Sequence, residues 1–450
     1  MSEAQHPSPA SETPENGSSA LETLMAGPRK LALLIGFGGL IAFAILTGIL
    51  ASAKGITFPK QAFMSYQSGI LYWLFLAVGS MFLILIQYLT GGRWGILMRR
   101  IFEANVRTML LGFVLFIPVI VSMFMGEKSS FWWAGHHHGE THDKALMEEQ
   151  KASKATTWKE AMNREEVANP NLEADVEAKV EEYLNPKFTA ARALVFWGLW
   201  GMIAFFLHKY GLKAERDGDA SARAKQKYVA SIGLFVFSIT VTMAVTDWVM
   251  SLEETFASSM FPVIYFGNSM ICSFGFAIIV LIWLNRNGQM PYYKTSEQIH
   301  LGSLFLAFAL FWAYTNFAQY MLTWVANLAE EIPYYLKRTR GGWQYLAFAL
   351  VVFHFFLPFG LLLFRHVKSS QKAMTRIAVM LMAVCFLDVL WWVEPAPLSM
   401  HTDQKLYLLL DVCAWVGIGG LWVWYFLGQL KKYPLVPTHE TYILEAHHDH

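Results

Sequence analysis

The segment 229-VASIGLFVFSITVTMAV-245 decides the fold class of this chain. It contains no charged residue, and with its neighbours it is long enough to cross the hydrocarbon core of a bilayer, about 30 Å thick. It runs directly into 246-TDWVMSLEETF-256, which puts Asp247, Glu253 and Glu254 at the end of the apolar run. These carboxylates belong either to a solvated loop or to the entrance of a site that handles charge inside a membrane.

The composition of the whole chain indicates that its solvent is a bilayer. Of 450 residues, 55% are hydrophobic and 15% are charged, and the mean hydropathy is +0.35, so polar groups cannot cover the surface. A net charge of +1 gives no support for a nucleic-acid partner. The cysteines Cys272, Cys385 and Cys413 lie in apolar runs without a CxxC or CxxCH motif, so disulfide frameworks, iron–sulfur clusters and attached c-type haem have no support in this chain.

Apolar runs predict an all-α integral membrane protein with about ten transmembrane helices, because continuous runs of this length satisfy their backbone groups only as helices. Short loops and span ends on one side carry 20 Lys and Arg residues against 6 on the other. This asymmetry predicts that both termini are cytoplasmic. The predicted spans cover about 30–51, 68–90, 106–125, 190–208, 228–247, 259–284, 300–327, 343–365, 374–393 and 406–429.

The same pattern divides the chain into five parts. We expect a disordered cytoplasmic tail over 1–28, helices one to three over 29–125, a polar extracytoplasmic insertion over 126–189, helices four to ten over 190–430 and a cytoplasmic tail over 431–450. The histidines of 136-HHH-138, His142 and 447-HHDH-450 have no cysteine or acidic cage at ligand spacing beside them. They are therefore interpreted as solvated and not as a metal site.

Polar residues inside the spans are the candidate functional positions, since charge in a membrane is costly. Asp247 and Glu254 lie seven residues apart and nearly share a helix face, whereas Glu253 points away, towards the headgroups or a partner. The seventh span carries a polar stripe that ends in a carboxylate, with Tyr320 beside it: Asn316, Gln319, Thr323, Asn327 and Glu330.

The ninth span and its exit supply the remaining candidates. Asp388 is expected inside the membrane and Glu394 nearer the outer surface, and Asp411 at the start of the last span can approach either. His354 is the histidine expected near the membrane centre. It has no second histidine at its depth, so a b-type haem is not favoured.

Two interpretations of these residues stay open. Buried carboxyl groups, histidine, tyrosine and amides are the materials of proton relays. The same groups also occur as satisfied helix ends and as hydrogen-bonding contacts between helices.

Three long motifs carry a resemblance to a known family: 247-DWVMSLEETFASSMFPVIYFGNS-269, 312-WAYTNFAQYMLTWVANLAEEIPYYLKRTRGGW-343 and 90-TGGRWGILMRR-100. Together they resemble the polysulfide reductase (NrfD-like) integral membrane proteins, and within that family the second NrfD-like subunit of Alternative Complex III, a quinol:cytochrome c oxidoreductase. At 253-EETFASSMF-261 the chain departs from the family, which commonly has a Pro-His-Trp type insert there.

The resemblance implies ten helices, largely in two four-helix bundles plus an extra helix pair, in a bacterial inner membrane. It implies no cofactor in this chain, and partners comprising a sister NrfD-like subunit, an iron–sulfur subunit, c-type haem subunits and a cytochrome c or terminal oxidase acceptor. Menaquinol or ubiquinol is the implied electron donor. The expected function is a proton path coupled to quinol oxidation. The alternatives are a quinol-binding subunit, a secondary transporter and a purely structural scaffold.

Overall fold

Ten helices of the computed structural model are long and apolar enough to cross a membrane, which confirms the predicted all-α membrane fold. This count applies to the residues that the structure describes, which are 14–54, 60–135, 183–253, 256–290, 293–326, 332–339, 342–394 and 404–435. No strand occurs among them.

The spans are continuous helices or, in two cases, consecutive helical segments. They comprise α1 (Pro14–Lys54), α2 (Lys60–Thr90), α3 (Arg99–Arg107) with α4 (Met109–Ser122), α8 (Pro186–Asp217), α9 (Ala220–Trp248), α10 (Phe261–Arg286), α11 (Thr295–Ala326), α13 (Trp343–Leu350) with η5 (Val351–Phe356) and α14 (Leu357–Leu363), α16 (Gln371–Val393) and α17 (Gln404–Leu430). The short elements between them are η1 (Arg93–Gly95), η2 (Gly126–Lys128), η3 (Trp132–Gly135), η4 (Met250–Leu252), α12 (Ile332–Lys337) and α15 (Arg365–Ser369).

Local sequence explains several helix boundaries. The side chain of Asn185 accepts a hydrogen bond from the N–H of Phe188, and Pro186 occupies the first turn of α8, where its missing N–H costs nothing. Gly218, at φ +61°, ends α8. Asp219 then caps α9. The turn between α8 and α9 lies within the charged stretch 213-KAERDGDASARAK-225.

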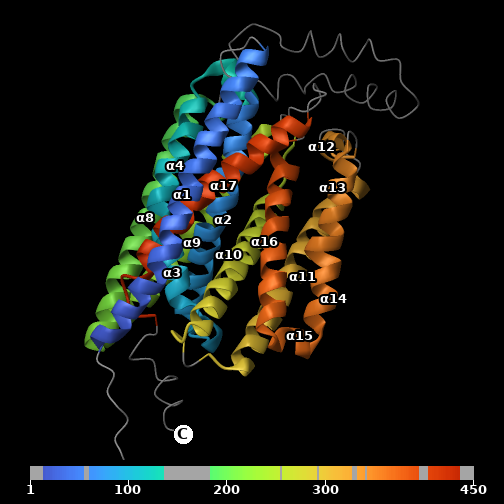
Figure 1. Ribbon diagram of the computed structural model, residues 1–450. Coiled ribbons are helices and arrows are strands. Elements are labelled where there is room, and N and C mark those ends of the chain that lie inside the picture. Colours follow the sequence, from blue (N-terminus) through green and yellow to red (C-terminus); the bar gives the residue numbers. More distant parts are fainter. Residues whose placement is uncertain are drawn as a thin grey trace, which may run out of the picture.

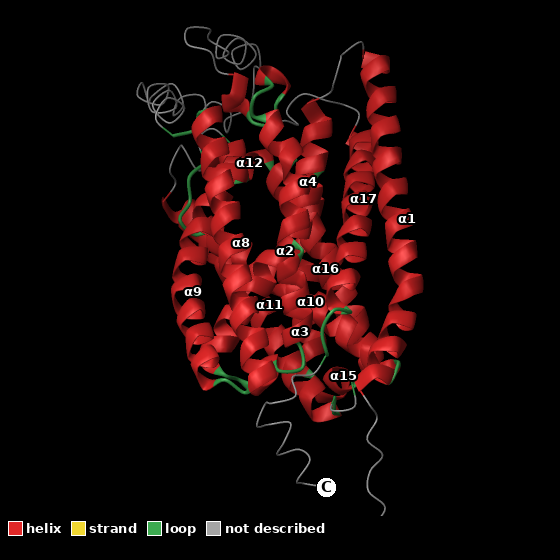
Figure 2. Ribbon diagram, turned by 90° about the vertical axis from the view of Figure 1, so that its left-hand side faces the viewer, coloured by secondary structure: helices red, strands yellow, loops and turns green. Residues whose placement is uncertain are grey.

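The helices form two four-helix groups that share a central contact (Figures 1 and 2). One group contains α2, α3 with α4, α8 and α9, and the other contains α10, α11, α13 to α14, and α16. α2 and α10 pack together at the centre, and about nine-tenths of their apolar windows is buried. α1 and α17 form the extra pair, with α17 packed on α2.

Glycines bring α1 and α17 into backbone contact. A Cβ added to Gly420 would lie 2.3 Å from the nitrogen of Gly36, and one added to Gly39 would lie 2.6 Å from the Cα of Gly417. Small residues allow helices to approach this closely in lipid, where packing replaces the hydrophobic driving force. Most of the remaining α1 surface is exposed to lipid, as its window is only 17% buried.

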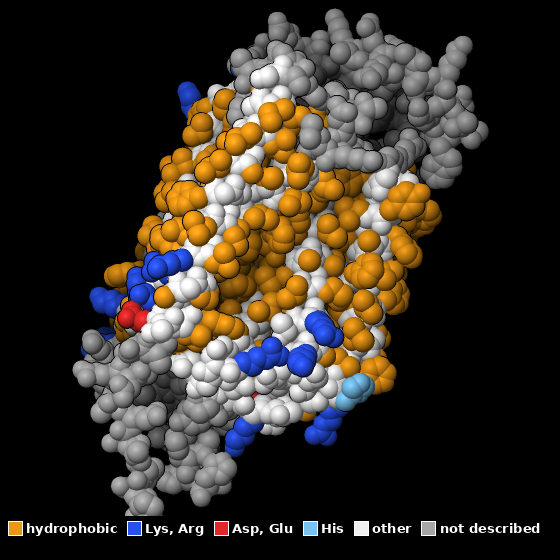
Figure 3. Space-filling model, viewed as in Figure 1, with side chains coloured by type: hydrophobic (Ala, Val, Ile, Leu, Met, Phe, Trp, Pro, Cys, Tyr) orange, Lys and Arg blue, Asp and Glu red, His pale blue; other side chains and the backbone are white. Residues whose placement is uncertain are grey.

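The N-terminal end of α1 and the C-terminal end of α17 lie at the same end of the bundle, which is called the basic end here (Figure 1). Figure 3 shows Lys and Arg side chains gathered at this end, beneath a broad hydrophobic band. The other end, where α2 and α10 begin, is called the opposite end. The start of α1 and the end of α17 therefore lie on the same side of the ten described spans, and the assignment of that side to the cytoplasm stays a prediction from the charge asymmetry.

Two expected boundaries differ from the structure. Residues 14–28, expected in a disordered tail, belong to α1. Residues 126–135, expected in the polar insertion, include the buried Phe131 and Trp133, whose indole donates to Ser251 Oγ at 3.3 Å. The rest of the insertion with its histidines, 136–182, and the tail 436–450 lie outside the described residues.

Candidate functional site

Asp388 lies at the centre of a buried polar cluster formed by three helices. Its Oδ2 accepts hydrogen bonds from Asn268 Nδ2 on α10 at 2.7 Å and from Trp312 Nε1 on α11 at 2.9 Å. Only 1% of Asp388 is exposed. Neither donor is a cation, so the protein holds this carboxyl group with neutral dipoles alone.

His354 completes this cluster from a fourth helical segment. It stacks on Trp312, with ring centroids 3.9 Å apart and planes 21° from parallel. Its Nδ1 lies 3.8 Å from Asp388 Oδ2 and has no hydrogen-bond partner among the described residues. A small approach of the two side chains would therefore join them.

The backbone around His354 is a π-helical turn. Pro358 has no N–H to offer the carbonyl of His354, and its ring crowds that carbonyl in an α-helix. The turn widens accordingly, and Leu357 N bonds to Val352 O, five residues back. Such π turns are frequently found at functional sites.

A second cluster lies at the opposite end, where Glu394 follows α16 and Asp411 lies in α17. Both carboxyl groups are buried, at 2% exposure each, and they interact directly. Gln61 on α2 donates from Nε2 to Glu394 Oε2. Burial, with the neighbouring Asp411 as a lesser cause, raises the pKa of Glu394 well above its usual range. The prediction that Asp411 approaches Asp388 or Glu394 is thus resolved in favour of Glu394.

Asp247 has a different environment, because an arginine neutralises it. Arg192 on α8 donates to both carboxylate oxygens, Nε to Oδ2 at 2.8 Å and Nη2 to Oδ1 at 3.0 Å. Arg192 also donates to the carbonyl of Tyr183 and to Thr189 Oγ1. This bidentate ion pair ties α8 to α9.

The expectations for Glu253 and Glu254 relied on a helix that does not continue. α9 ends at Trp248, and Glu253 has an extended backbone after η4. Glu253 is not directed towards the headgroups: it is 7% exposed and pairs with Arg338 Nη1 at 3.1 Å and Lys337 Nζ at 2.7 Å. Glu254 lies outside the described residues, so its predicted shared face with Asp247 has no support from a continuous helix.

Arg338 joins three chain segments at the opposite end. It is fully buried and stacks over Tyr334, 3.6 Å from the ring centroid. It donates to the carbonyls of Tyr334, Trp391 and Trp392 as well as to Glu253. The end of α16 is therefore fixed by an arginine just beyond the Asp388 cluster.

The basic end holds a further arginine-paired set. Glu103 accepts from Arg99 Nε at 3.2 Å, from Arg100 Nη1 at 2.6 Å and from the hydroxyl of Tyr88 at 2.7 Å. Arg100 also pairs with Glu215 of α8. These buried ion pairs connect α2, α3 and α8.

The predicted polar stripe on α11 is only partly directed inward. Gln319 and Thr323 are buried and bonded to each other at 3.3 Å, and Gln319 Oε1 accepts from Ser258 at 2.6 Å. Asn316 is half-buried and donates to the carbonyl of Trp312 in its own helix. Tyr320 is 45% exposed on the outer face. Asn327 and Glu330 lie outside the described residues.

Sequence reasoning missed most partners of the candidate residues. Arg192 and Arg338 lie near span ends, where basic residues are common. Nothing in the sequence distinguishes Asn268 and Trp312 from the other polar and aromatic residues of the spans. One available signal was the spacing of Gln61, Ser65 and Ser68, which lie four and three residues apart and therefore share one face of α2.

Among the described residues, no group of three or more His, Cys, Asp and Glu side chains could hold a metal ion. A search of family models and a search of curated proteins both return no match for this chain. The relationship to NrfD-like proteins therefore stays a prediction from the quoted motifs.

Proposed function

We propose that this chain is a cofactor-free membrane subunit of a respiratory quinol:cytochrome c or terminal-oxidase oxidoreductase complex, and that it provides a proton-conducting path coupled to quinol oxidation. The observation that carries this proposal is Asp388. It is buried within a span, receives two neutral hydrogen-bond donors and lies 3.8 Å from the unbonded Nδ1 of His354.

The buried acids fall into two classes, and this division supports the proposal. Asp247, Glu253 and Glu103 each pair with an arginine, and these ion pairs hold helices together. Asp388, Glu394 and Asp411 have no Arg or Lys partner among the described contacts. A buried carboxyl group without a counter-ion is costly to ionise, so it can take up and release a proton without breaking a salt bridge.

His354 and Asp388 together form the first site at which protons can be taken up and released. The imidazole can accept a proton on Nδ1 and pass one from Nε2, while the carboxyl group accepts or releases at Oδ2. Glu394 and Asp411 form the second such site, at the opposite end of the bundle, where two adjacent carboxyl groups are stable with a proton between them. The acids paired with arginine are left out of the proposed path.

The partners and location belong to the proposal through the quoted motifs. We expect a bacterial inner membrane with cytoplasmic termini, a sister NrfD-like subunit, an iron–sulfur subunit and c-type haem subunits. Direct quinol binding is less favoured at the cavity bounded by Leu71, Trp200, Trp248 and Tyr265, because its volume of about 10 Å³ has room for about one water molecule. A quinone headgroup needs polar groups that fix its oxygens.

The proposal is tested with Asp388→Asn in the assembled complex in vesicles of its native membrane. Quinol is added as reductant, and proton release per electron is followed with a pH-sensitive dye. We expect the proton-to-electron ratio to fall, because asparagine keeps the hydrogen-bond acceptor but cannot carry the proton. Asp219→Asn, at the α9 cap outside the spans, is the matched control. Normal turnover with an unchanged ratio in Asp388→Asn would reject the proposed path.

A further inference from the structure

A polar face of α2 leads from the carboxyl pair into the membrane. Gln61, Ser65, Ser68 and Tyr72 lie at offsets of 0, 4, 7 and 11, so they point within about 60° of one another on the helix. Gln61 donates to Glu394, and the buried hydroxyls of Ser68 and Ser65 lie near Glu394 and Asp411 respectively, without forming a hydrogen bond among the described residues. The inner end of this face is the hydroxyl of Tyr72.

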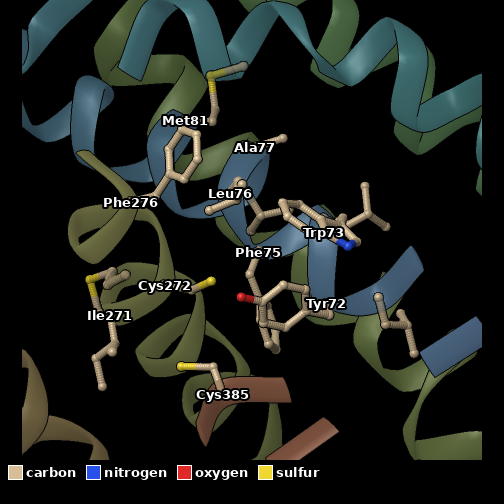
Figure 4. Packing of buried hydrophobic residues seen from close by; sticks show 14 of the residues in the cluster. Tyr72, Trp73, Phe75, Leu76, Ala77, Met81, Ile271, Cys272, Phe276 and Cys385 are labelled. Atoms are coloured by element: carbon tan, nitrogen blue, oxygen red, sulfur yellow. The ribbon is translucent and has the colours of Figure 1, made fainter. Parts of the chain in front are cut away.

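Tyr72 is completely buried, and its ring is held in place. Trp73, Phe75, Phe386 and Trp415 contact it edge to face at centroid distances of 5.2 to 6.1 Å. Such contacts leave the ring little freedom, so the hydroxyl has a defined position. It points towards the thiols of Cys272 on α10 and Cys385 on α16, and it interacts with Cys272 (Figure 4).

The two thiols reach from Tyr72 to the Asp388 cluster. Cys385 interacts with Cys272, and its Sγ lies 3.8 Å from His354 Nε2. Both cysteines are unpaired and fully buried. The other ring nitrogen of His354 faces Asp388.

Helix geometry places Tyr72 on α2 and Cys385 on α16 at about the same level along the bundle. Cys385 is nine residues before Glu394, which is about 14 Å along α16, and Tyr72 is eleven residues after Gln61, about 16 Å along α2. Since Gln61 and Glu394 touch, both measurements begin at the same level. Tyr72 is thus the group on α2 that comes level with the thiols.

We propose that Tyr72, Cys272 and Cys385 connect the Glu394–Asp411 pair to His354 and Asp388 as a hydrogen-bonded relay. The inference rests on the proposed proton-conducting function and names the residues that connect the two proton-exchanging sites. In each step a hydroxyl or thiol accepts a proton on its lone pair and donates its own proton to the next group, so that no group retains a net charge. Reorientation of the hydroxyl and thiols then resets the chain.

The experiment uses the same vesicles and the same proton-to-electron ratio. Tyr72→Phe removes the hydroxyl and keeps the ring contacts, and it is expected to lower the ratio to the level of Asp388→Asn. Tyr293→Phe, a buried tyrosine near the basic end of α10, is the matched control and is expected to keep the ratio. Cys272→Ala is expected to lower the ratio, whereas Cys272→Ser, which keeps a donor and acceptor, is expected to restore most of it.

These variants separate the two proposals. A fall in Asp388→Asn with unchanged ratios in Tyr72→Phe and Cys272→Ala would overturn the relay and leave the proton path standing. Unchanged ratios in all three would overturn both. If Tyr72→Phe reduces the amount of assembled complex, the comparison of Cys272→Ala with Cys272→Ser decides, and equal loss in both variants would overturn the relay.

Discussion

The same Asp→Asn change should destabilise the protein far more at Asp247 than at Asp388. At Asp247 it leaves the Arg192 guanidinium, 7% exposed, without its counter-ion. Removing one partner of a buried ion pair costs about 3–5 kcal/mol, or roughly two to four orders of magnitude in the unfolding equilibrium. At Asp388 no cation is left behind, and an amide oxygen still accepts from Asn268 and Trp312. We expect less than about 1.5 kcal/mol there, the scale of one hydrogen bond.

A double-mutant cycle sharpens this prediction. Arg192→Met alone leaves Asp247 buried and unpaired, so it should also cost about 3–5 kcal/mol. Arg192→Met combined with Asp247→Leu removes both charges and should cost less than either single change. Unfolding of the purified chain by SDS titration in mixed micelles, followed by tryptophan fluorescence, measures all of these variants. Additive costs in the double variant, or equal costs at Asp247 and Asp388, would refute the division of the acids into paired and unpaired classes.

Three further predictions address other contacts. Glu394→Gln should reduce the loss of stability that the native chain shows above about pH 4.5, because a raised folded-state pKa makes unfolding release a proton, at up to about 1.4 kcal/mol per pH unit. Apparent melting temperatures from pH 5 to 9 test this, and parallel curves for the two chains would contradict it. Gly420→Leu should cost at least about 1–3 kcal/mol in SDS titration, because its Cβ meets backbone, whereas Gly38→Leu has open space and should be neutral; equal effects would discount the helix contact. Arg338→Met should cost about 3–5 kcal/mol by the same titration and Lys337→Met, 43% exposed, under about 1 kcal/mol; the reverse order would show that Lys337 is the effective partner of Glu253.

The fold could be predicted largely from hydropathy, because each span must satisfy its own backbone in lipid. The place of Asp388 in an apolar run predicts a position inside the membrane, and the structure buries it between helices within α16. Helix wheels were reliable only where the helix continued. α9 ends at Trp248, so the wheel assigned Glu253 to the wrong environment.

Pairing between helices was not predictable from one sequence. Asn268 and Trp312 meet Asp388 because α10, α11 and α16 are neighbours with a particular rotation, and spacing within one helix carries no information about either. The α11 stripe shows the same limit. Its residues share a face, yet Gln319 and Thr323 are buried while Asn316 is only half-buried.

The glycine contact between α1 and α17 also has a consequence for biosynthesis. About 350 residues separate the end of α1 at Lys54 from the start of α17 at Gln404. At 5–20 residues per second, α1 waits about 20–70 s in the membrane before its partner is made. During that time Gly36 and Gly39 lack the surface that covers them in the finished fold. A chaperone or insertase that shields α1 would therefore act on the earliest helix until the last one arrives, and a ribosome stalled before α17 should leave α1 accessible to cross-linking from lipid.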